Sequence, residues 1–269
     1  MIIKTIQDYE NLCNPQYLFR GQSNKNWPLL PNAYRSDSNI NCPAIERESV
    51  DRFIRHLQEN GYNDFPCNLN HFDFLTKPNK IFPTEELLPY WALAQHYAFD
   101  SQFHWLKTSL LDVTHNLDIA AYFAVEKKTE ESTDGRIFIF DPSIIKEPYK
   151  YYEPLGGSRI EARLVIQDCG FIYRVQICEH ASECAPYKNK DCFNDIVKDT
   201  LIIPKELKPQ LKEYLQKKLF DLFMYPRLIL GRVTPNLATA GHHSFEELVN
   251  INKPSVERAE RLGDKHSGY

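Results

Sequence analysis

The sequence predicts an α+β protein with a single domain, in which helices lie mainly in the N-terminal half and pack on a mixed or antiparallel sheet. Helical patterns dominate the first half of the chain, and strand-like segments gather after residue 134. The two kinds of segment do not alternate strictly, which disfavours a doubly wound parallel sheet. With 269 residues, 42% of them hydrophobic, the chain is long enough to bury a substantial core.

The helices are predicted from apolar spacing and from capping residues. They are expected at residues 5–12, 44–58, 85–98, 116–127 and 205–219. In the second helix Val50, Phe53 and Ile54 share one face, and Leu57 extends it. The helix at 116–127 is apolar on most sides, which indicates burial, and either Asn116 or Thr114 is expected to cap it.

The strands are predicted from runs of aromatic and β-branched residues between turn signals. They are expected at residues 17–20, 135–142, 163–168, 170–177 and 200–204, with further strand-like pieces near 227–233. Residues 135–142 form the clearest of these, because Asp134-Gly135 precedes them and Asp141-Pro142 ends them. Residues 60–84 hold three prolines and are expected to form an irregular insertion. We predict one domain over residues 1–250, followed by a polar tail at 251–269.

Composition narrows the classes of partner. A net charge of −4 and a pI near 6.2 give no general attraction for phosphate backbones, so nucleic acid is disfavoured. No apolar run reaches the roughly 18–20 residues that cross a bilayer, and the N-terminal segment does not resemble a secretory signal. We therefore expect a cytoplasmic protein without membrane association. Its seven cysteines are expected as free thiols; their spacing lacks a C-x₂-C pair, and no metal site is predicted.

The segment YLFRGQ carries the strongest functional signal. Arg20 ends the predicted first strand, where its planar fork of donors suits a phosphate, a carboxylate or a pair of sugar hydroxyls. Gly21 lets the backbone turn sharply or approach a ligand closely, and Gln22 adds an amide donor and acceptor. The structural alternative is a buried arginine that pairs with a carboxylate of the core.

Two further clusters hold candidate residues. Gln95, His96 and Tyr97 lie at the end of a predicted helix, where a histidine often interacts with the helix dipole instead of a ligand. In TSLLDVTHN (108–116), Asp112 follows two leucines that are expected to be buried, and a buried carboxylate needs a partner. Arg20 is the expected partner.

Several motifs occur in order along residues 14–208: FRGQ; Trp27, Leu29, Pro31 and Arg35; a helix with Glu46, Glu48 and Phe53; AQHY; LLDVT; AAYFA; DGRIFIFDP; RIEARLVIQDCGF; and LIIPKELK. Together they resemble the FRG domain family, named for its Phe-Arg-Gly motif. The chain departs from that pattern in four ways. AFDSQFHWLK separates AQHY from LLDVT, and Ser109 stands where the family commonly has arginine. Val113 stands where an aromatic residue is common, and YPRLILG (225–231) lacks an acidic motif often found there.

The resemblance implies a nucleotide-type pocket around Arg20. An Arg-Gly at the end of an early strand is also similar to the NAD-gripping arginine of arginine-type ADP-ribosyltransferases, and FRG proteins are suspected of roles in bacterial defence or toxicity. On this interpretation Arg20, Asp112 and Glu48 are catalytic. Ligand contacts are expected from Gly21, Gln22, His96, Tyr97, Thr114 and Gln167.

Two other functions compete with an NAD-consuming enzyme. A binding or sensing module would use the same pocket without turnover, and a nuclease is disfavoured by the acidic pI and the missing metal cluster. No cofactor is expected as a requirement, and NAD is expected as a substrate. The expected partner is a small-molecule nucleotide or a protein substrate. The oligomeric state is not predicted.

Overall fold

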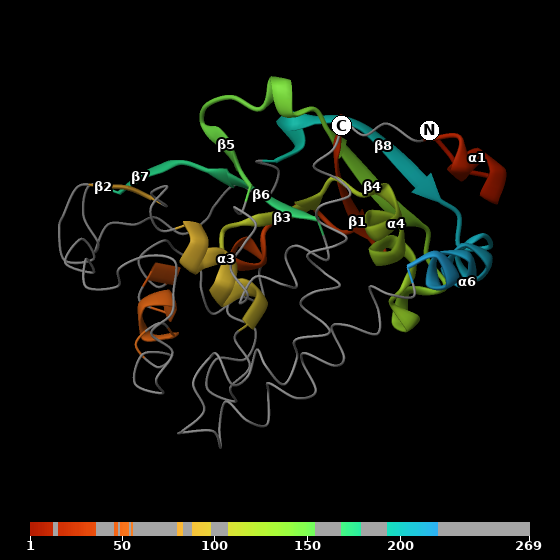
Figure 1. The fold of residues 1–269 in the computed structure, drawn as a ribbon, viewed down its shortest axis with the longest axis horizontal. Coiled ribbons are helices and arrows are strands. Elements are labelled where there is room, and N and C mark those ends of the chain that lie inside the picture. Colours follow the sequence, from red (N-terminus) through yellow and green to blue (C-terminus); the bar gives the residue numbers. More distant parts are fainter. Residues whose placement is uncertain are drawn as a thin grey trace, which may run out of the picture.

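A six-stranded antiparallel sheet runs through the described part of the chain, in the order β5-β6-β3-β1-β4-β8 (Figure 1). Its strands are β1 Leu18–Gln22, β3 Leu111–Thr114, β4 Gly135–Phe140, β5 Tyr149–Tyr152, β6 Cys169–Arg174 and β8 Val197–Ile203. A separate antiparallel pair joins β2 (Lys80–Phe82) to β7 (Gln176–Cys178). The N-terminal segment adds an isolated parallel bridge from Ile2 to Ile202 of β8.

In this computed structural model the described residues are 1–12, 16–35, 46–47, 49–53, 55, 80–82, 88–97, 107–153, 168–178 and 193–219. At 80–82, 90, 93, 96–97 and 176–178 the description covers the backbone alone. The helices are α1 Ile6–Glu10, α3 Leu88–Tyr97, α4 Leu117–Val125 and α6 Lys208–Lys218, and residues 46–47, 49–53 and 55 are also helical. Single turns of 3₁₀ helix occur at η1 Asn32–Tyr34, η4 Lys128–Glu130, η5 Pro142–Ile144 and η7 Asn194–Ile196.

Local side chains fix where the helices begin. Thr5 and Asp8 form a capping box at α1, in which each side chain accepts from the backbone of the other residue. Asn116 caps α4, because its side-chain oxygen accepts from the backbone amides of Asp118 and Ile119. Of the two caps considered for this helix, asparagine is therefore the one that forms.

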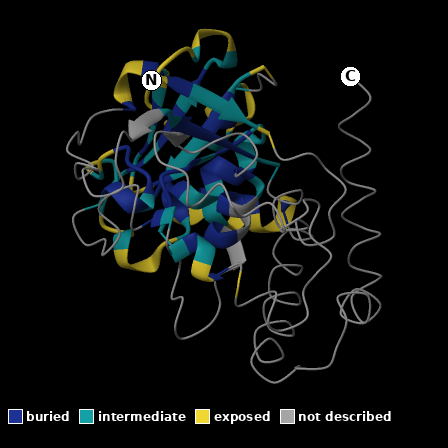
Figure 2. Cartoon of the chain, turned by 90° about the vertical axis from the view of Figure 1, so that its left-hand side faces the viewer, coloured by how far each residue is buried: buried dark blue, intermediate teal, exposed yellow. Residues whose placement is uncertain are grey.

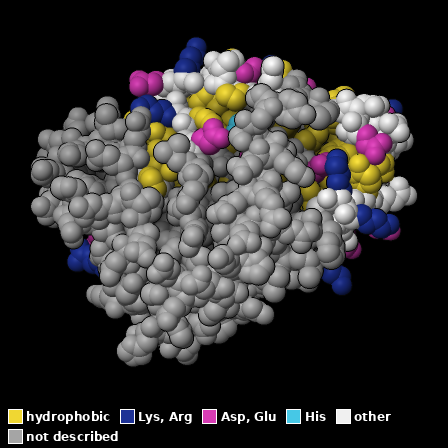
Figure 3. Space-filling model, viewed as in Figure 1, with side chains coloured by type: hydrophobic (Ala, Val, Ile, Leu, Met, Phe, Trp, Pro, Cys, Tyr) yellow, Lys and Arg dark blue, Asp and Glu magenta, His cyan; other side chains and the backbone are white. Residues whose placement is uncertain are grey.

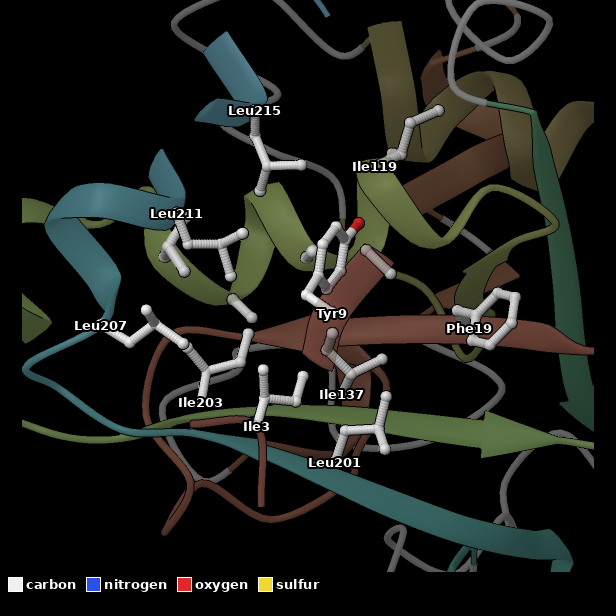
Figure 4. Close-up of a cluster of buried hydrophobic side chains, with 14 of the residues drawn as sticks. Ile3, Tyr9, Phe19, Ile119, Ile137, Leu201, Ile203, Leu207, Leu211 and Leu215 are labelled. Atoms are coloured by element: carbon white, nitrogen blue, oxygen red, sulfur yellow. The ribbon is translucent and has the colours of Figure 1, made fainter. Parts of the chain in front are cut away.

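The sheet separates two hydrophobic clusters. Phe19 of β1 and Ile137 of β4 face α4 and α6, and they pack there with Leu201, Leu211 and others (Figure 4). Their neighbours in sequence, Leu18 and Phe138, belong to the second cluster on the opposite face, as the alternation of side chains along a strand requires. The buried side chains concentrate along the sheet and the helices that cover it (Figure 2).

The α+β class and the antiparallel sheet agree with the prediction, while the gathering of helices in the N-terminal half stays a prediction, as do the domain limits. Several boundaries differ. The strand expected at 170–177 is interrupted at Val175 and forms β6 and β7, and the one expected at 200–204 begins earlier, at Val197. Residues 80–82 pair as β2 inside the segment expected to be irregular, and β3 and β5 were not predicted as strands. The predicted pieces at 163–167 and 227–233 lie outside the described residues.

None of the helices in the described ranges is long and apolar enough to cross a membrane. A cytoplasmic location stays a prediction.

Candidate functional site

The position of Arg20 follows from the alternation along β1. Phe19 and Gly21 face α4, so Arg20 and Gln22 point to the face that carries Leu18 and the second cluster. On β4, Phe138 is the cross-strand partner of Arg20, and Arg136 is that of Gln22. β1 contacts β3 through one paired position, Phe19 with Thr114. A polar group therefore lies over an otherwise apolar sheet face, beside the point where β1 and β3 stop pairing.

Arg20 contacts Asp112 of β3 twice. Its Nη1 donates to the backbone carbonyl of Asp112 at 2.6 Å and to the Oδ2 of the carboxylate at 3.3 Å. The side chain of Arg20 is 13% exposed and that of Asp112 is 31% exposed, so the pair lies at the boundary of the interior. The predicted ion pair forms. The Nε of Arg20 is buried and has no hydrogen-bond partner.

A chain of hydrogen bonds continues from Asp112 into the interior. Gln95 of α3 donates from Nε2 to the Oδ1 of Asp112, and the hydroxyl of Thr108 donates to the Oε1 of Gln95. Gln95 and Thr108 are both buried. The amide of Gln95 thus orients the carboxylate of Asp112 from the side opposite to Arg20.

Glu46 is a second buried carboxylate in this part of the fold. It is 0% exposed, and its Oε1 accepts from Trp91 Nε1 at 2.8 Å, from the Ser109 amide at 2.6 Å and from the Ser109 hydroxyl at 3.0 Å. A carboxylate that accepts several donors is stabilised in its charged form inside a protein. Through Trp91 and Ser109, Glu46 connects α3 to the segment that leads into β3.

Gly21 has a packing role that the sequence did not reveal. A Cβ at this position would overlap the carbonyl oxygen of Ala120, and it would come within 2.9 Å of the Ala124 amide nitrogen. Glycine therefore allows α4 to lie directly against β1. This contact is on the face away from Arg20.

Of the other predicted contact residues, the structure describes the side chains of Gln22 and Thr114. Gln22 is 5% exposed; its Nε2 donates to the carbonyl of Pro28 at 3.2 Å, while its Oε1 has no partner. Thr114 accepts from the Asn116 amide at 3.0 Å, which helps the chain turn into α4. His96 and Tyr97 end α3, but their side chains are outside the description, and Glu48 and Gln167 lie outside the described residues.

Sequence reasoning placed Gln95 in a candidate cluster without giving it a role, and it did not select Glu46, Thr108 or Ser109 as site residues. The role predicted for Glu48 stays a prediction. Gln95 stands in the same AQHY motif as His96, so a helical-face argument would have placed it toward the core with Trp91, four residues earlier. Thr108 and Ser109 carry no such signal, because they act through the fold that brings 108–112 against α3.

A cavity of about 640 Å³ lies away from Arg20, beside the edge strand β5. Its described lining residues are Leu88, Ile145, Lys146, Glu147, Tyr149, Lys150, Tyr151, Tyr152, Glu153 and Tyr173. Burial raises the pKa of Tyr151, and the Glu153 carboxylate adds to this; the Tyr151 hydroxyl lies 2.9 Å from His115 Nε2. Figure 3 shows acidic and hydrophobic side chains next to one another on one face of the described part of the molecule. Among the side chains that the structure describes, none of the predicted site residues lines this cavity.

Comparison with known proteins gives one finding on family. No curated protein and no solved structure matches the chain. Residues 15–133 match a family model described as FRG domain. This range contains Arg20, Glu46, Gln95 and Asp112 with the strands and helices that position them. Residues 15–133 are therefore similar to the FRG domain, and the Arg20–Asp112 network lies within this range.

Proposed function

We propose that this FRG domain binds a nucleotide through Arg20 and that NAD is its substrate. The products would be nicotinamide and an ADP-ribose group passed to water or to a protein, in a bacterial defence or toxicity role. The observation that carries the proposal is the state of Arg20: its side chain is 13% exposed, Asp112 holds Nη1, and the buried Nε has no partner.

The contact with Asp112 leaves donors of Arg20 for a ligand. Both observed hydrogen bonds use Nη1, and a guanidinium has five N–H donors in a fixed plane. Because the backbone carbonyl of Asp112 anchors one end of the fork, the rest of it has a set direction. A preorganised, partly desolvated arginine of this kind suits a phosphate or a pair of ribose hydroxyls.

Asp112 is the carboxylate that contacts Arg20 among the described residues. In NAD cleavage the bond between the nicotinamide nitrogen and ribose C1′ breaks, and its electron pair leaves with nicotinamide. The acceptor oxygen bonds to C1′ and releases its proton to solvent. The transition state carries positive charge on the ribose, which a nearby carboxylate stabilises. Gln95 and Arg20 fix the orientation of Asp112 for this role.

Binding without turnover is the alternative, and the same contacts favour it in one respect. Both carboxylate oxygens of Asp112 already accept hydrogen bonds, Oδ1 from Gln95 and Oδ2 from Arg20. Each such donor weakens the carboxylate as a base, since hydrogen bonding stabilises its charged form. In that case Asp112 would serve to position Arg20, and the domain would sense the nucleotide.

Measurements of NAD binding and NAD consumption on the purified chain test both functions. The variants are Arg20→Lys, which keeps the charge and removes the fork, and Asp112→Asn; Arg174→Gln on β6 is the matched control. If the domain is an enzyme, Arg20→Lys and Asp112→Asn are each expected to reduce NAD turnover about a hundredfold or more. Thermal melting checks that the variants are folded. Binding without turnover that depends on Arg20 supports the sensing module. Binding and turnover that are unchanged in folded Arg20→Lys contradict both functions.

A further inference from the structure

We infer that Arg136 and Gln22 complete a diphosphate-binding site with Arg20, so that the ligand of this domain is recognised through a pyrophosphate group. This inference rests on the proposed function, because it extends the Arg20 pocket to a second cation. Arg136 was not selected from the sequence as a site residue. The argument depends on where β4 places it.

The three side chains share one face of the sheet. Gln22 and Arg136 are directly paired across β1 and β4, and Arg20 is paired with Phe138. Arg20 and Arg136 are therefore diagonal neighbours, whose Cα atoms are separated by about 7–8 Å in such a ladder. Side chains of this length reach one another across that spacing.

The guanidinium of Arg136 lies over the ring of Phe138. Its central carbon lies 5.2 Å from the centroid of the Phe138 ring, and Phe138 is the residue directly opposite Arg20. Phe138 is 2% exposed, so the Arg136 cation lies over an apolar ring of β4, while Nη1 of Arg20 reaches Asp112 of β3 on the other side of β1. An anion that lies over β1 would contact both cations and offset their charge.

The hydrogen-bonding capacity of this group is incomplete. Arg20 Nε, Arg136 Nε and Gln22 Oε1 are the buried side-chain nitrogen and oxygen atoms without a partner in the described part of the chain. Buried polar atoms are nearly always paired, and an unpaired one costs about 1–3 kcal/mol. All three lie on adjacent positions of two strands, which indicates a site prepared for an external partner.

The donors and acceptors of the group identify the ligand class. Asp112 offsets the charge of Arg20, whereas no ion pair of Arg136 is found among the described residues, so the group keeps a net positive charge. Two guanidiniums present two planar forks, which match the two phosphates of a pyrophosphate better than a single phosphate. Gln22 Oε1 is an acceptor and suits a hydroxyl of the adjoining ribose.

Calorimetric titration of the full chain with inorganic pyrophosphate, ADP-ribose and adenosine tests the inference. Arg136→Gln is expected to weaken binding of the first two by about tenfold to a hundredfold, the range for one charge-assisted contact, and to leave adenosine unaffected. Arg174→Gln removes a guanidinium from the same sheet face on β6 and is expected to change nothing. Pyrophosphate binding that persists unchanged in folded Arg136→Gln overturns the inference.

The outcomes separate this inference from the proposed function. NAD binding that requires Arg20 but not Arg136 keeps the proposed function and refutes the diphosphate site. Pyrophosphate binding that requires Arg136, with no NAD binding or turnover, supports the site and refutes the proposed substrate. If the wild-type chain binds none of the probes, both fail. Should Arg136→Gln not fold, Arg136→Lys retains a cation over Phe138, and its expected loss is about tenfold because the fork is gone.

Discussion

On the face of the sheet that α4 and α6 cover, Lys208 donates from Nζ to the carbonyls of Ser23 at 2.5 Å and Glu130 at 2.8 Å. On the opposite face Arg20, Gln22 and Arg136 each keep a buried atom without a partner. The same two strands, β1 and β4, thus contribute to both environments. On the first face the buried polar atoms are paired within the fold. On the second face the unpaired atoms mark where a ligand would bind.

The largest expected effect tests the closely packed face. Gly21→Ala should destabilise the fold by about 4 kcal/mol or more, because its Cβ would overlap the Ala120 carbonyl oxygen of α4. This oxygen can move away only if the whole helix moves. Chemical denaturation of the variant measures this. Gly170→Ala is the control: there the Cβ meets the ring of Tyr151, and a side chain can rotate away. Equal costs at both positions would contradict the packing role of Gly21.

The next prediction concerns the buried carboxylate behind the site. Glu46→Ala should cost about 3 kcal/mol, because the Trp91 indole and the amide and hydroxyl of Ser109 would lose their shared acceptor in a fully buried place. Equilibrium unfolding gives the cost, and Glu46→Gln should recover part of it. A nearly neutral Glu46→Ala would show that this network is not needed for stability.

Parts of the fold and of the site could be predicted from the sequence, and other parts could not. Asn116 and the apolar run after it predicted α4, and turn residues on both sides predicted β4, because these signals are local. β3 and β5 each have four residues and depend on pairing with β6, which sequence patterns do not encode. The Arg20–Asp112 pair was predictable, since a buried carboxylate needs a cation. The role of Glu46 was not predictable, because it depends on how its helix packs against Trp91 of α3.

Lys208 allows a test of pairing on the α4 face by pH. Lys208→Met should cost about 2 kcal/mol at neutral pH, because two backbone carbonyls lose their donor. Burial lowers the pKa of Lys208 below 10.5 in the folded chain. At pH values between this lowered pKa and 10.5 the unfolded chain binds more protons than the folded chain, so the free energy of unfolding rises with pH. The difference between wild type and variant should therefore widen as pH approaches 10.5. A difference that narrows would show that the charged form is the stabilising one.

The smallest expected change in stability is at Gln22, where the comparison is sharpest. Gln22→Met keeps the length of the side chain, removes an acceptor that has no partner, and loses one hydrogen bond to the Pro28 carbonyl, which belongs to an exposed residue. Replacing a buried polar group by an apolar one of similar shape is nearly neutral, so the change should stay within about 1 kcal/mol. Affinity for ADP-ribose should nevertheless fall, because the ribose contact is gone. A variant that loses stability and keeps affinity would place Gln22 with the residues that hold the fold together. The unpaired oxygen would then be a tolerated defect of the sheet and would say nothing about a ligand.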